Sequence, residues 1–301
     1  MKTSQNTVSV IGYASGIGAG NTLCDQAVSQ LNNSSHLSDL NLNWKAIIIP
    51  NGQSTGRDAL PAIADMSDKL AHISLNLAHQ RDFFVTLGGD HTSAIGTWSG
   101  VATAIAPESL GLIWIDAHLD SHTFETTPSG NIHGMPLAVL LGQGHHSLTQ
   151  ILTDSPKLLP QNVCVIGARS FEAGERKLLE ALKVRIYYME EIQERGLAEI
   201  FKEAVALVTT QANFFGISLD LDAIDPLQAP GVGTPEPNGL DSEALINAFA
   251  HLGEDPRFIA AEIVEFNPTL DKDHKTEKIV VAVLKQFTQN SGEESNASSI
   301  E

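Results

Sequence analysis

Short apolar runs rich in β-branched residues alternate with amphipathic stretches along almost the whole chain. Continuous apolar runs separated by stretches of helical periodicity are typical of parallel strands that helices cover on both faces. The runs that we expect to form strands are 7–13, 44–50, 82–89, 110–116, 162–168, 184–189, 213–222 and 257–266. The stretches that we expect to form helices are 57–79, 134–142, 174–183, 190–208 and 241–252.

This alternation predicts an α/β fold, a single three-layer αβα domain around a central, mainly parallel sheet of about eight strands. The 301 residues would suffice for one large domain or two ordinary ones. No internal repeat, Pro/Gly-rich linker or change of composition marks a boundary between two domains. We therefore expect one domain over residues 1–287, followed by a polar tail, 288–301, whose composition is that of a disordered segment.

Composition and charge narrow the range of partners. The chain has 36 acidic and 18 basic residues, a net charge of −18, which argues against nucleic acid and is compatible with a small cationic ligand. Its two cysteines, Cys24 and Cys164, argue against a disulfide framework or a thiolate metal site and favour a reducing cytoplasm. No apolar run reaches the length of a signal peptide core or a membrane span. We expect a cytoplasmic protein with neither a nucleic acid nor a membrane as partner.

Acidic residues and histidines follow three of the predicted strands. Open parallel sheets bind their ligands beyond the carboxyl ends of the strands. Where the chain stays extended, residues at i, i+2 and i+4 point to one side, so those of each group can face a common point. The residues are Asp90 and His91 in FFVTLGGDH, Asp116, His118 and Asp120 in LIWIDAHLD, and Asp220 and Asp222 in GISLDLDAIDP.

Each of these motifs alone has an ordinary explanation. Asp90 can cap the next helix, an Asp-x-Asp pair can be two solvated carboxylates, and a single histidine at a strand end is commonly a hydrogen-bonded structural residue. Their joint occurrence favours a ligand site instead. Six of the residues supply four carboxylates and two neutral imidazoles: His91, Asp116, His118, Asp120, Asp220 and Asp222.

Four neighbouring carboxylates cannot all stay ionised without compensation, and two divalent cations would neutralise them. A cysteine-free, oxygen-rich ligand set favours two Mn(II) ions, with Fe(II) or Co(II) as substitutes. Two such ions would sit roughly 3.5–4 Å apart and ionise a shared water near neutral pH. The sequence thus predicts a two-metal hydrolytic site.

The same loops resemble the signature blocks of the ureohydrolase family, which includes arginases, agmatinases and formimidoylglutamases. The matching segments occur in the family's order within residues 82–287: GGDHTSAIGT (88–97), DAHLDSHT (116–123), SGNIHGMP (129–136), SLDLDAIDP (218–226) and EIVEFNPT (262–269). The resemblance implies that one manganese ion takes His91, Asp116, Asp120 and Asp220. It implies that the other takes Asp116, His118, Asp220 and Asp222, so that Asp116 and Asp220 bridge.

The resemblance also implies roles for residues around the metals. Glu265 would hold the guanidinium group, Asp120 would accept a proton from the nucleophile, and His133 would pass a proton to the leaving amine. Thr234 matches a loop residue near the site. Without the resemblance, these positions would be a strand-end carboxylate, an ordinary loop histidine and a turn residue.

Two further segments are most similar to the arginase version of the family. TTPSGNIHGMP (126–136) implies that Thr127, Ser129 and Asn131 hold the α-carboxylate of an amino acid. GARSFEAGE (167–175) implies that Glu172 and Glu175 contact its α-amino group, although both acids could simply stabilise a helix N-terminus.

Two features depart from the arginase pattern. The loop ASGIGAGNTLCDQAV (14–28) replaces the Arg-Gly-Gly and Gly-Pro motifs that arginases usually carry there. His122 stands where arginases often have an asparagine on the α-carboxylate, and a histidine can still donate a hydrogen bond to that group.

The expected function is hydrolysis of L-arginine, a small cationic guanidino amino acid, to L-ornithine and urea by a homo-trimer or hexamer. One alternative is another ureohydrolase: an agmatinase, guanidinobutyrase or formimidoylglutamase. Another is a non-catalytic, metal-binding member of the family. A two-metal phosphoesterase would need basic residues near the site, and Arg169 is the nearest in the candidate substrate loops.

Overall fold

The chain forms one sheet of eight parallel strands, as the sequence predicts. The computed structural model describes residues 7–20 and 23–288, so residues 289–301 of the predicted tail lie outside the described part. The strand order is β2-β1-β3-β8-β7-β4-β5-β6, and every pairing is parallel. The strands are β1 Val8–Tyr13, β2 Leu42–Ile48, β3 Phe84–Gly88, β4 Leu110–Ile115, β5 Val163–Ala168, β6 Arg185–Tyr188, β7 Phe214–Asp220 and β8 Phe258–Val264.

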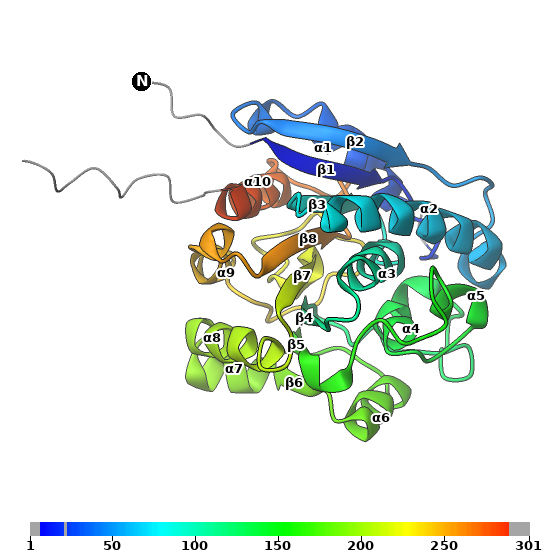
Figure 1. Ribbon diagram of the computed structural model, residues 1–301. Coiled ribbons are helices and arrows are strands. Elements are labelled where there is room, and N and C mark those ends of the chain that lie inside the picture. Colours follow the sequence, from blue (N-terminus) through cyan, green and yellow to red (C-terminus); the bar gives the residue numbers. More distant parts are fainter. Residues whose placement is uncertain (1–6, 21–22, 289–301) are drawn as a thin grey trace, which may run out of the picture.

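Helices cover both faces of this sheet and complete a three-layer αβα fold (Figure 1). Helices α2 to α6 pack on one face, and α1 and α7 to α10 pack on the other. Their bounds are α1 Ala27–Asn32, α2 Leu60–His79, α3 Ser93–Ile105, α4 Pro136–Leu140, α5 His146–Thr149, α6 Ala173–Leu182, α7 Met189–Arg195, α8 Leu197–Val208, α9 Ser242–Ala248 and α10 Lys275–Thr288. Short 3-10 turns are η1 Leu23–Gln26, η2 Ser35–Leu37, η3 Gly56–Ala59, η4 Ile132–Gly134, η5 Pro160–Asn162, η6 Leu221–Ala223 and η7 Leu252–Glu254.

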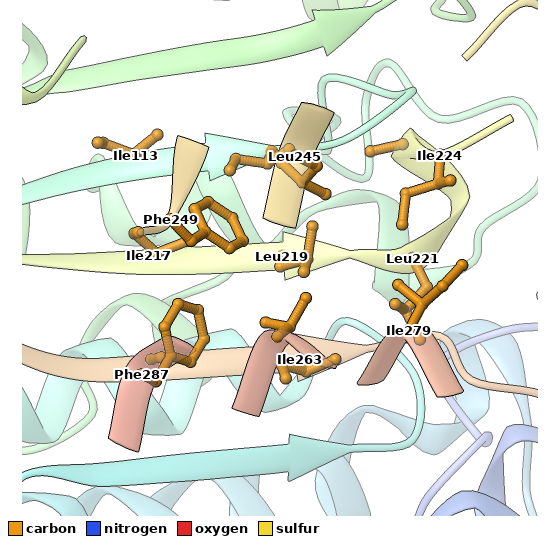
Figure 2. Close-up of a cluster of buried hydrophobic side chains, with 14 of the residues drawn as sticks. Ile113, Ile217, Leu219, Leu221, Ile224, Leu245, Phe249, Ile263, Ile279 and Phe287 are labelled. Carbon is orange, nitrogen blue, oxygen red and sulfur yellow. The ribbon is translucent and has the colours of Figure 1, made fainter. Parts of the chain in front are cut away.

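The sequences of the central strands are continuous apolar runs because both faces of these strands are buried. In β4, Leu112 and Trp114 enter the core beneath α2 and α3, whereas Ile113 and Ile115 enter the opposite core. Figure 2 shows part of that opposite core, where side chains of β4, β7 and β8 meet those of α9 and α10.

Helix α3 lies in a stretch for which the sequence predicts no helix. Ten of its 13 residues are buried, so it lacks the polar face that gives a surface helix its recognisable period. Its glycines allow unusually close packing on α2. A Cβ atom on Gly96 would lie 2.6 Å from the carbonyl oxygen of Ser67, and one on Gly100 would lie 2.3 Å from that of Ala71.

Helix α10 also lies outside the stretches for which the sequence predicts a helix, as do the short helices α1 and α5. Its run Ile279–Leu284 is rich in β-branched residues, which favour strands when taken alone. The helix begins where the Asp271 carboxylate accepts hydrogen bonds from the backbone N–H groups of Thr276 and Glu277.

Three expected helices are shorter or divided. The stretch 190–208 divides at Gly196, whose φ of +84° ends α7 before α8 begins. The stretch 241–252 contains α9, which Asp241 caps, and then the separate turn η7. The stretch 134–142 contains only α4. Among the described residues, no helix is long and apolar enough to span a bilayer.

Candidate metal centre and active site

Four adjacent strands bring the candidate residues to one edge of the sheet. In the order β3-β8-β7-β4, the carboxyl ends lead to His91, Glu265, Asp220 and Asp116 respectively. Ile115 pairs with Leu219, so Asp116 and Asp220 follow in register on neighbouring strands. The parallel topology therefore assembles residues that lie up to 174 positions apart along the chain.

The first group of ligand atoms surrounds His91. Its Nδ1 lies 2.9 Å from Asp120 Oδ2, 3.2 Å from Asp220 Oδ2 and 3.4 Å from Asp116 Oδ2. All four residues are buried. Three carboxylates thus converge on one imidazole nitrogen.

The second group surrounds His118 and shares Asp116 with the first. His118 Nδ1 lies 3.2 Å from Asp222 Oδ2 and 3.4 Å from Asp116 Oδ1. Within each of the groups His91–Asp116–Asp220 and Asp116–His118–Asp222, the ligand atoms lie within 4.8 Å of one another. The six residues selected from the sequence form two adjoining clusters.

The local backbone differs from the extended chain that the i, i+2, i+4 spacing suggests. Strand β4 ends at Ile115, and Asp116 Oδ1 accepts a hydrogen bond of 2.7 Å from the N–H of His118, which bends the chain. Asp120 has a φ of +45°. Asp220 Oδ1 likewise accepts from the N–H of Asp222 within the turn η6. The side chains converge because these turns fold back.

The hydrogen bonds of His91 test whether the cluster fits a metal. Its Nε2 lies 2.9 Å from Ser218 Oγ, and that hydroxyl donates to Glu262 Oε2. Ser218 has a single proton to give, so Nε2 carries a hydrogen, and in the neutral imidazole that a metal requires the lone pair is on Nδ1. This Nδ1 is buried and has no hydrogen-bond partner among the described residues.

Three buried carboxylates around Nδ1 need a positive charge, which either a proton on that nitrogen or a cation between the groups supplies. The donor set therefore fits divalent cations, and the hydrogen-bonded Nε2 is the usual arrangement of a metal-binding histidine. Oxygen ligands outnumber nitrogen ligands, which suits a hard or borderline ion.

Glu265 lies beside this centre, next to His133. Its Oε1 accepts hydrogen bonds from the backbone N–H of His91 at 3.0 Å and from His133 Nδ1 at 3.1 Å. Burial alone would lower the pKa of His133, but the hydrogen bond and charge of Glu265 outweigh burial and raise it to about 9. His133 is therefore positively charged at neutral pH and has a proton to give.

Cys24 contacts Glu265, although the sequence analysis does not place it among the candidate site residues. Its Sγ donates to Glu265 Oε2 at 3.4 Å, and its side chain is buried. Burial, reinforced by the Glu265 charge, raises the pKa of the thiol far above its usual range, so the thiol stays protonated. The only signal in the sequence is the unusual loop 14–28, in which Cys24 lies.

Asp90 holds that same loop. Its Oδ2 accepts from the N–H of Gly18 at 2.8 Å, and its Oδ1 accepts from the N–H of Thr92 at 3.0 Å. The carbonyl of Gly18 in turn accepts from the N–H of His133 at 3.1 Å. Two described residues of the segment 14–28, Gly18 and Cys24, therefore contact His133 and Glu265 respectively.

A cavity of about 180 Å³ opens outward from the cluster. Thr234 lies on its wall and donates to Asp222 Oδ2 at 2.8 Å. The candidate substrate residues line it together with several of the ligand residues: Thr127, Ser129, Asn131, His122, Glu172 and Glu175. A larger hollow between Thr7 and Phe287 lacks such a cluster.

Within this cavity, Thr127, Ser129 and Asn131 form a compact loop. Thr127 Oγ1 lies 3.4 Å from Ser129 Oγ and accepts from the N–H of Gly130 at 3.0 Å. Ser129 Oγ accepts from the N–H of Asn131 at 3.2 Å. Ser129 is exposed, so its hydroxyl can still bind a small polar group.

His122 bridges two acids across the cavity. Its Nε2 lies 2.9 Å from Glu172 Oε2 and 3.4 Å from Glu175 Oε2, and its Nδ1 lies 3.1 Å from Thr126 Oγ1. The side-chain oxygen of Glu175 also accepts from the N–H of Glu172 in a capping box at the start of α6. Burial raises the pKa of Glu175 to about 8. The two acids thus have both a capping role and a place in the cavity.

Arg169 is not free to bind a phosphate. Its guanidinium donates to five backbone carbonyl oxygens, those of Gly167, Asp222, Ala223, Glu236 and Pro237. These bonds use its whole donor set to hold the loops around Asp222. The geometry therefore argues against a phosphoesterase.

A parallel αβα sheet binds its ligands at the carboxyl edge, and paired His/Asp groups there are suited to the metal pair of a hydrolase. A model of the Arginase family matches residues 9–288, nearly the whole chain. The arginase of Bacillus caldovelox is 44% identical over 225 residues, which are 75% of each chain. The chain belongs to the Arginase family.

Solved structures agree with this assignment. An arginase structure from Bacillus subtilis superposes with a TM-score of 0.86 at 37% identity, covering 96% of this chain and 99% of the other. The arginase of Entamoeba histolytica, solved in complex with L-ornithine, gives a TM-score of 0.84 at 26% identity and covers 93% and 98% of the two chains. The ureohydrolase family and the αβα fold expected from the sequence are both confirmed.

Proposed function

We propose that this protein hydrolyses L-arginine to L-ornithine and urea with two manganese ions. The observation that carries the proposal is the pair of ligand groups joined at Asp116, in which the Nδ1 of His91 faces three carboxylate oxygens. Arginases 34–44% identical to this chain support the choice of arginine. The relative solved with L-ornithine supports an amino acid product.

We propose the following ligands for the two ions. One would be held by His91, Asp116, Asp120 and Asp220, and the other by Asp116, His118, Asp220 and Asp222. When bound, a pair of divalent cations lowers the pKa of water and supplies the nucleophile for attack on the guanidinium carbon. Fe(II) or Co(II) could substitute for Mn(II).

The residues of the chain orient the substrate and move protons. Glu265 Oε2 accepts a guanidinium N–H, which fixes the carbon near the centre. Asp120 takes the proton released by the nucleophile. His133, which is charged at neutral pH, gives a proton to the leaving amine of ornithine.

The outer cavity would hold the amino acid end of the substrate. Thr127, Ser129 and Asn131 would contact the α-carboxylate, and Glu172 and Glu175 the α-amino group. His122, between these acids, would donate to the α-carboxylate from a place where arginases often have asparagine. Thr234 would keep Asp222 in position through its hydrogen bond.

A substrate panel tests the proposal. Manganese-loaded protein should release urea from L-arginine at least roughly tenfold faster, in kcat/KM, than from agmatine or guanidinobutyrate, because only arginine fills both charged ends of the cavity. It should leave formiminoglutamate unchanged, and chelated protein should release no urea. Faster turnover of another panel member would identify a different ureohydrolase. Turnover of none, with two metals bound, would indicate a non-catalytic member of the family.

Cys24 provides a second test within this mechanism. Cys24→Ala removes a hydrogen bond from a weak S–H donor to the Glu265 carboxylate, worth about 1 kcal/mol, so kcat/KM should fall roughly fivefold. Cys24→Ser, which keeps a donor, should recover most of the loss, and Cys164→Ala in the distant core strand β5 should leave kcat/KM unchanged. Wild-type kcat/KM in Cys24→Ala would show that the thiol does not position Glu265.

Assembly and location belong to the same proposal. A homo-trimer or hexamer is expected from the family resemblance. Cys24 and Cys164 are free thiols, which supports a cytoplasmic location.

A further inference from the structure

Two histidines and a glutamate converge at a place outside the active-site cavity. His36 lies in η2, His274 directly precedes α10, and Glu277 lies in the first turn of α10. His36 Nδ1 is 3.0 Å from Glu277 Oε1, and His274 Nδ1 is 2.9 Å from Glu277 Oε2. One nitrogen or oxygen atom from each residue lies within 4.8 Å of the other two. None of the three lines the cavity of the active site.

The three side chains differ in solvent exposure, and that of Glu277 is by far the most buried. The side chain of Glu277 is 2% exposed, whereas those of His36 and His274 are 37% and 58% exposed. The carboxylate is therefore at the bottom of the cluster and the imidazoles are at its mouth. An ion could enter from solvent and keep water as a further ligand.

The Glu277 carboxylate is held in place by residues other than the histidines. Gln30 Nε2 donates to its Oε2 at 3.1 Å, and Ser34 Oγ donates to its Oε1. Burial alone would raise the pKa of Glu277, but the hydrogen bonds from Ser34, His36, His274 and Gln30 outweigh it and lower the pKa to about 2. The cluster therefore has an ionised and fixed oxygen ligand at neutral pH.

The backbone before α10 is strained in a way that presents His274 to this carboxylate. Asp273 and His274 have φ values of +58° and +53°, in the left-handed region that residues other than glycine rarely adopt. The Asp271 carboxylate fixes the start of α10 behind them through the N–H groups of Thr276 and Glu277. The imidazole of His274 is thus directed to Glu277 at a conformational cost.

We propose that His36, His274 and Glu277 form a further metal site that binds Zn²⁺ and is distinct from the two-metal centre. Two imidazole nitrogens and one carboxylate, with a position left for water, are a ligand set that zinc favours over manganese. Each neutral imidazole moves its proton from Nδ1 to Nε2 and gives the Nδ1 lone pair to the ion. The net charge of −18 favours the approach of a cation.

A zinc ion here would clamp two segments that lead to the active site. Helix α1, from which Gln30 comes, follows the turn η1 that contains Cys24. On α10, Thr276 Oγ1 accepts from the N–H of Gly231, in the loop that leads to Thr234. The expected effect of zinc is therefore greater stability rather than turnover.

Metal counting tests the proposal. Manganese-loaded protein is dialysed against low-micromolar Zn²⁺, and total bound metal per chain is measured by mass spectrometry. The test variant is His36→Asn/His274→Asn. The Asn side-chain nitrogen stands near the place of Nδ1 and keeps a donor to Glu277 but offers no lone pair, and Asn tolerates positive φ. Wild type should bind one ion more than this variant.

The chain offers a closely matched control. His251 also has a positive φ, +68°, and lies 3.0 Å from Glu254 three residues later, as His274 does from Glu277. Among the described residues this pair has no second histidine in a ligand group. His251→Asn should therefore keep the wild-type metal count.

Thermal unfolding gives a second readout. Zinc should raise the melting temperature of the wild type and of His251→Asn by roughly 2–5 °C and leave His36→Asn/His274→Asn unchanged. Equal total metal counts in wild type and the double variant would overturn the proposal, as would an equal loss in His251→Asn. Neither measurement depends on turnover, so failure of the arginase assignment would not affect this result, and the converse also holds.

Discussion

Asp220→Asn is expected to lower kcat/KM for arginine at least roughly 10³-fold, because the proposed bridging carboxylate of the proposed two-metal centre loses its charge. Asp220 is the last residue of β7, and its Oδ2 lies 3.2 Å from His91 Nδ1. Asparagine keeps the Oδ1 acceptor for the N–H of Asp222, so the local turn should be retained. Elemental analysis should find fewer than two manganese ions per chain in the variant.

The control for this variant is Asp68→Asn, an exposed aspartate on α2 that belongs neither to a ligand group nor to the cavity wall. It removes the same charge and should change neither turnover nor metal content. Wild-type turnover of Asp220→Asn with two manganese ions bound would show that the ligand assignment is wrong. Asp116→Asn should behave as Asp220→Asn does, since Asp116 belongs to both ligand groups.

Glu265→Gln is expected to lower kcat/KM roughly 10²–10³-fold while leaving the metal content unchanged. Glutamine keeps an acceptor for the N–H of His91 but replaces the negative charge that the guanidinium cation needs. Glu265 is not a member of either ligand group, so two manganese ions should still bind. Loss of metal together with activity would place Glu265 among the ligands instead.

The pH profile of this variant tests the partnership with His133. Glu265 raises the pKa of His133, and the protonated imidazole is the proposed proton donor, so wild-type kcat should decline as pH rises through about 9. Without the carboxylate, the pKa of His133 falls and the decline should begin at lower pH. His133→Asn should lack this alkaline decline. An unchanged profile in Glu265→Gln would separate His133 from Glu265 in the mechanism.

The sequence by itself determined the sheet and the chemistry at its edge. Continuous apolar runs are recognisable because strands covered on both faces exclude polar residues, and all eight predicted strands are present. Acids and histidines that directly follow predicted strands are also recognisable. Parallel topology brings the carboxyl ends of all these strands to one edge of the sheet, so such residues are expected to lie together. The clustering of the six candidate ligands follows from those two facts. The domain limits and the ligand roles stay predictions.

The sequence pattern did not predict the local structure correctly where a helix is buried on all sides or where the chain bends. Helix α3 has no polar face, so its period is invisible, although its glycines Gly96 and Gly100 decide how closely α2 packs. The segment Asp116–Asp120 is bent rather than extended, because carboxylates accept backbone hydrogen bonds that a strand would not offer.

Only the tertiary structure decided which side chains become partners. Cys24 contacts Glu265 at a sequence separation of 241 residues, and His36 contacts Glu277 at the same separation. The Arg169 guanidinium donates its hydrogen bonds to backbone carbonyls of the loops, and His122 lies between Glu172 and Glu175. Periodicity and composition are properties of neighbours along the chain, whereas these contacts depend on the paths of distant segments, which packing of the whole core fixes.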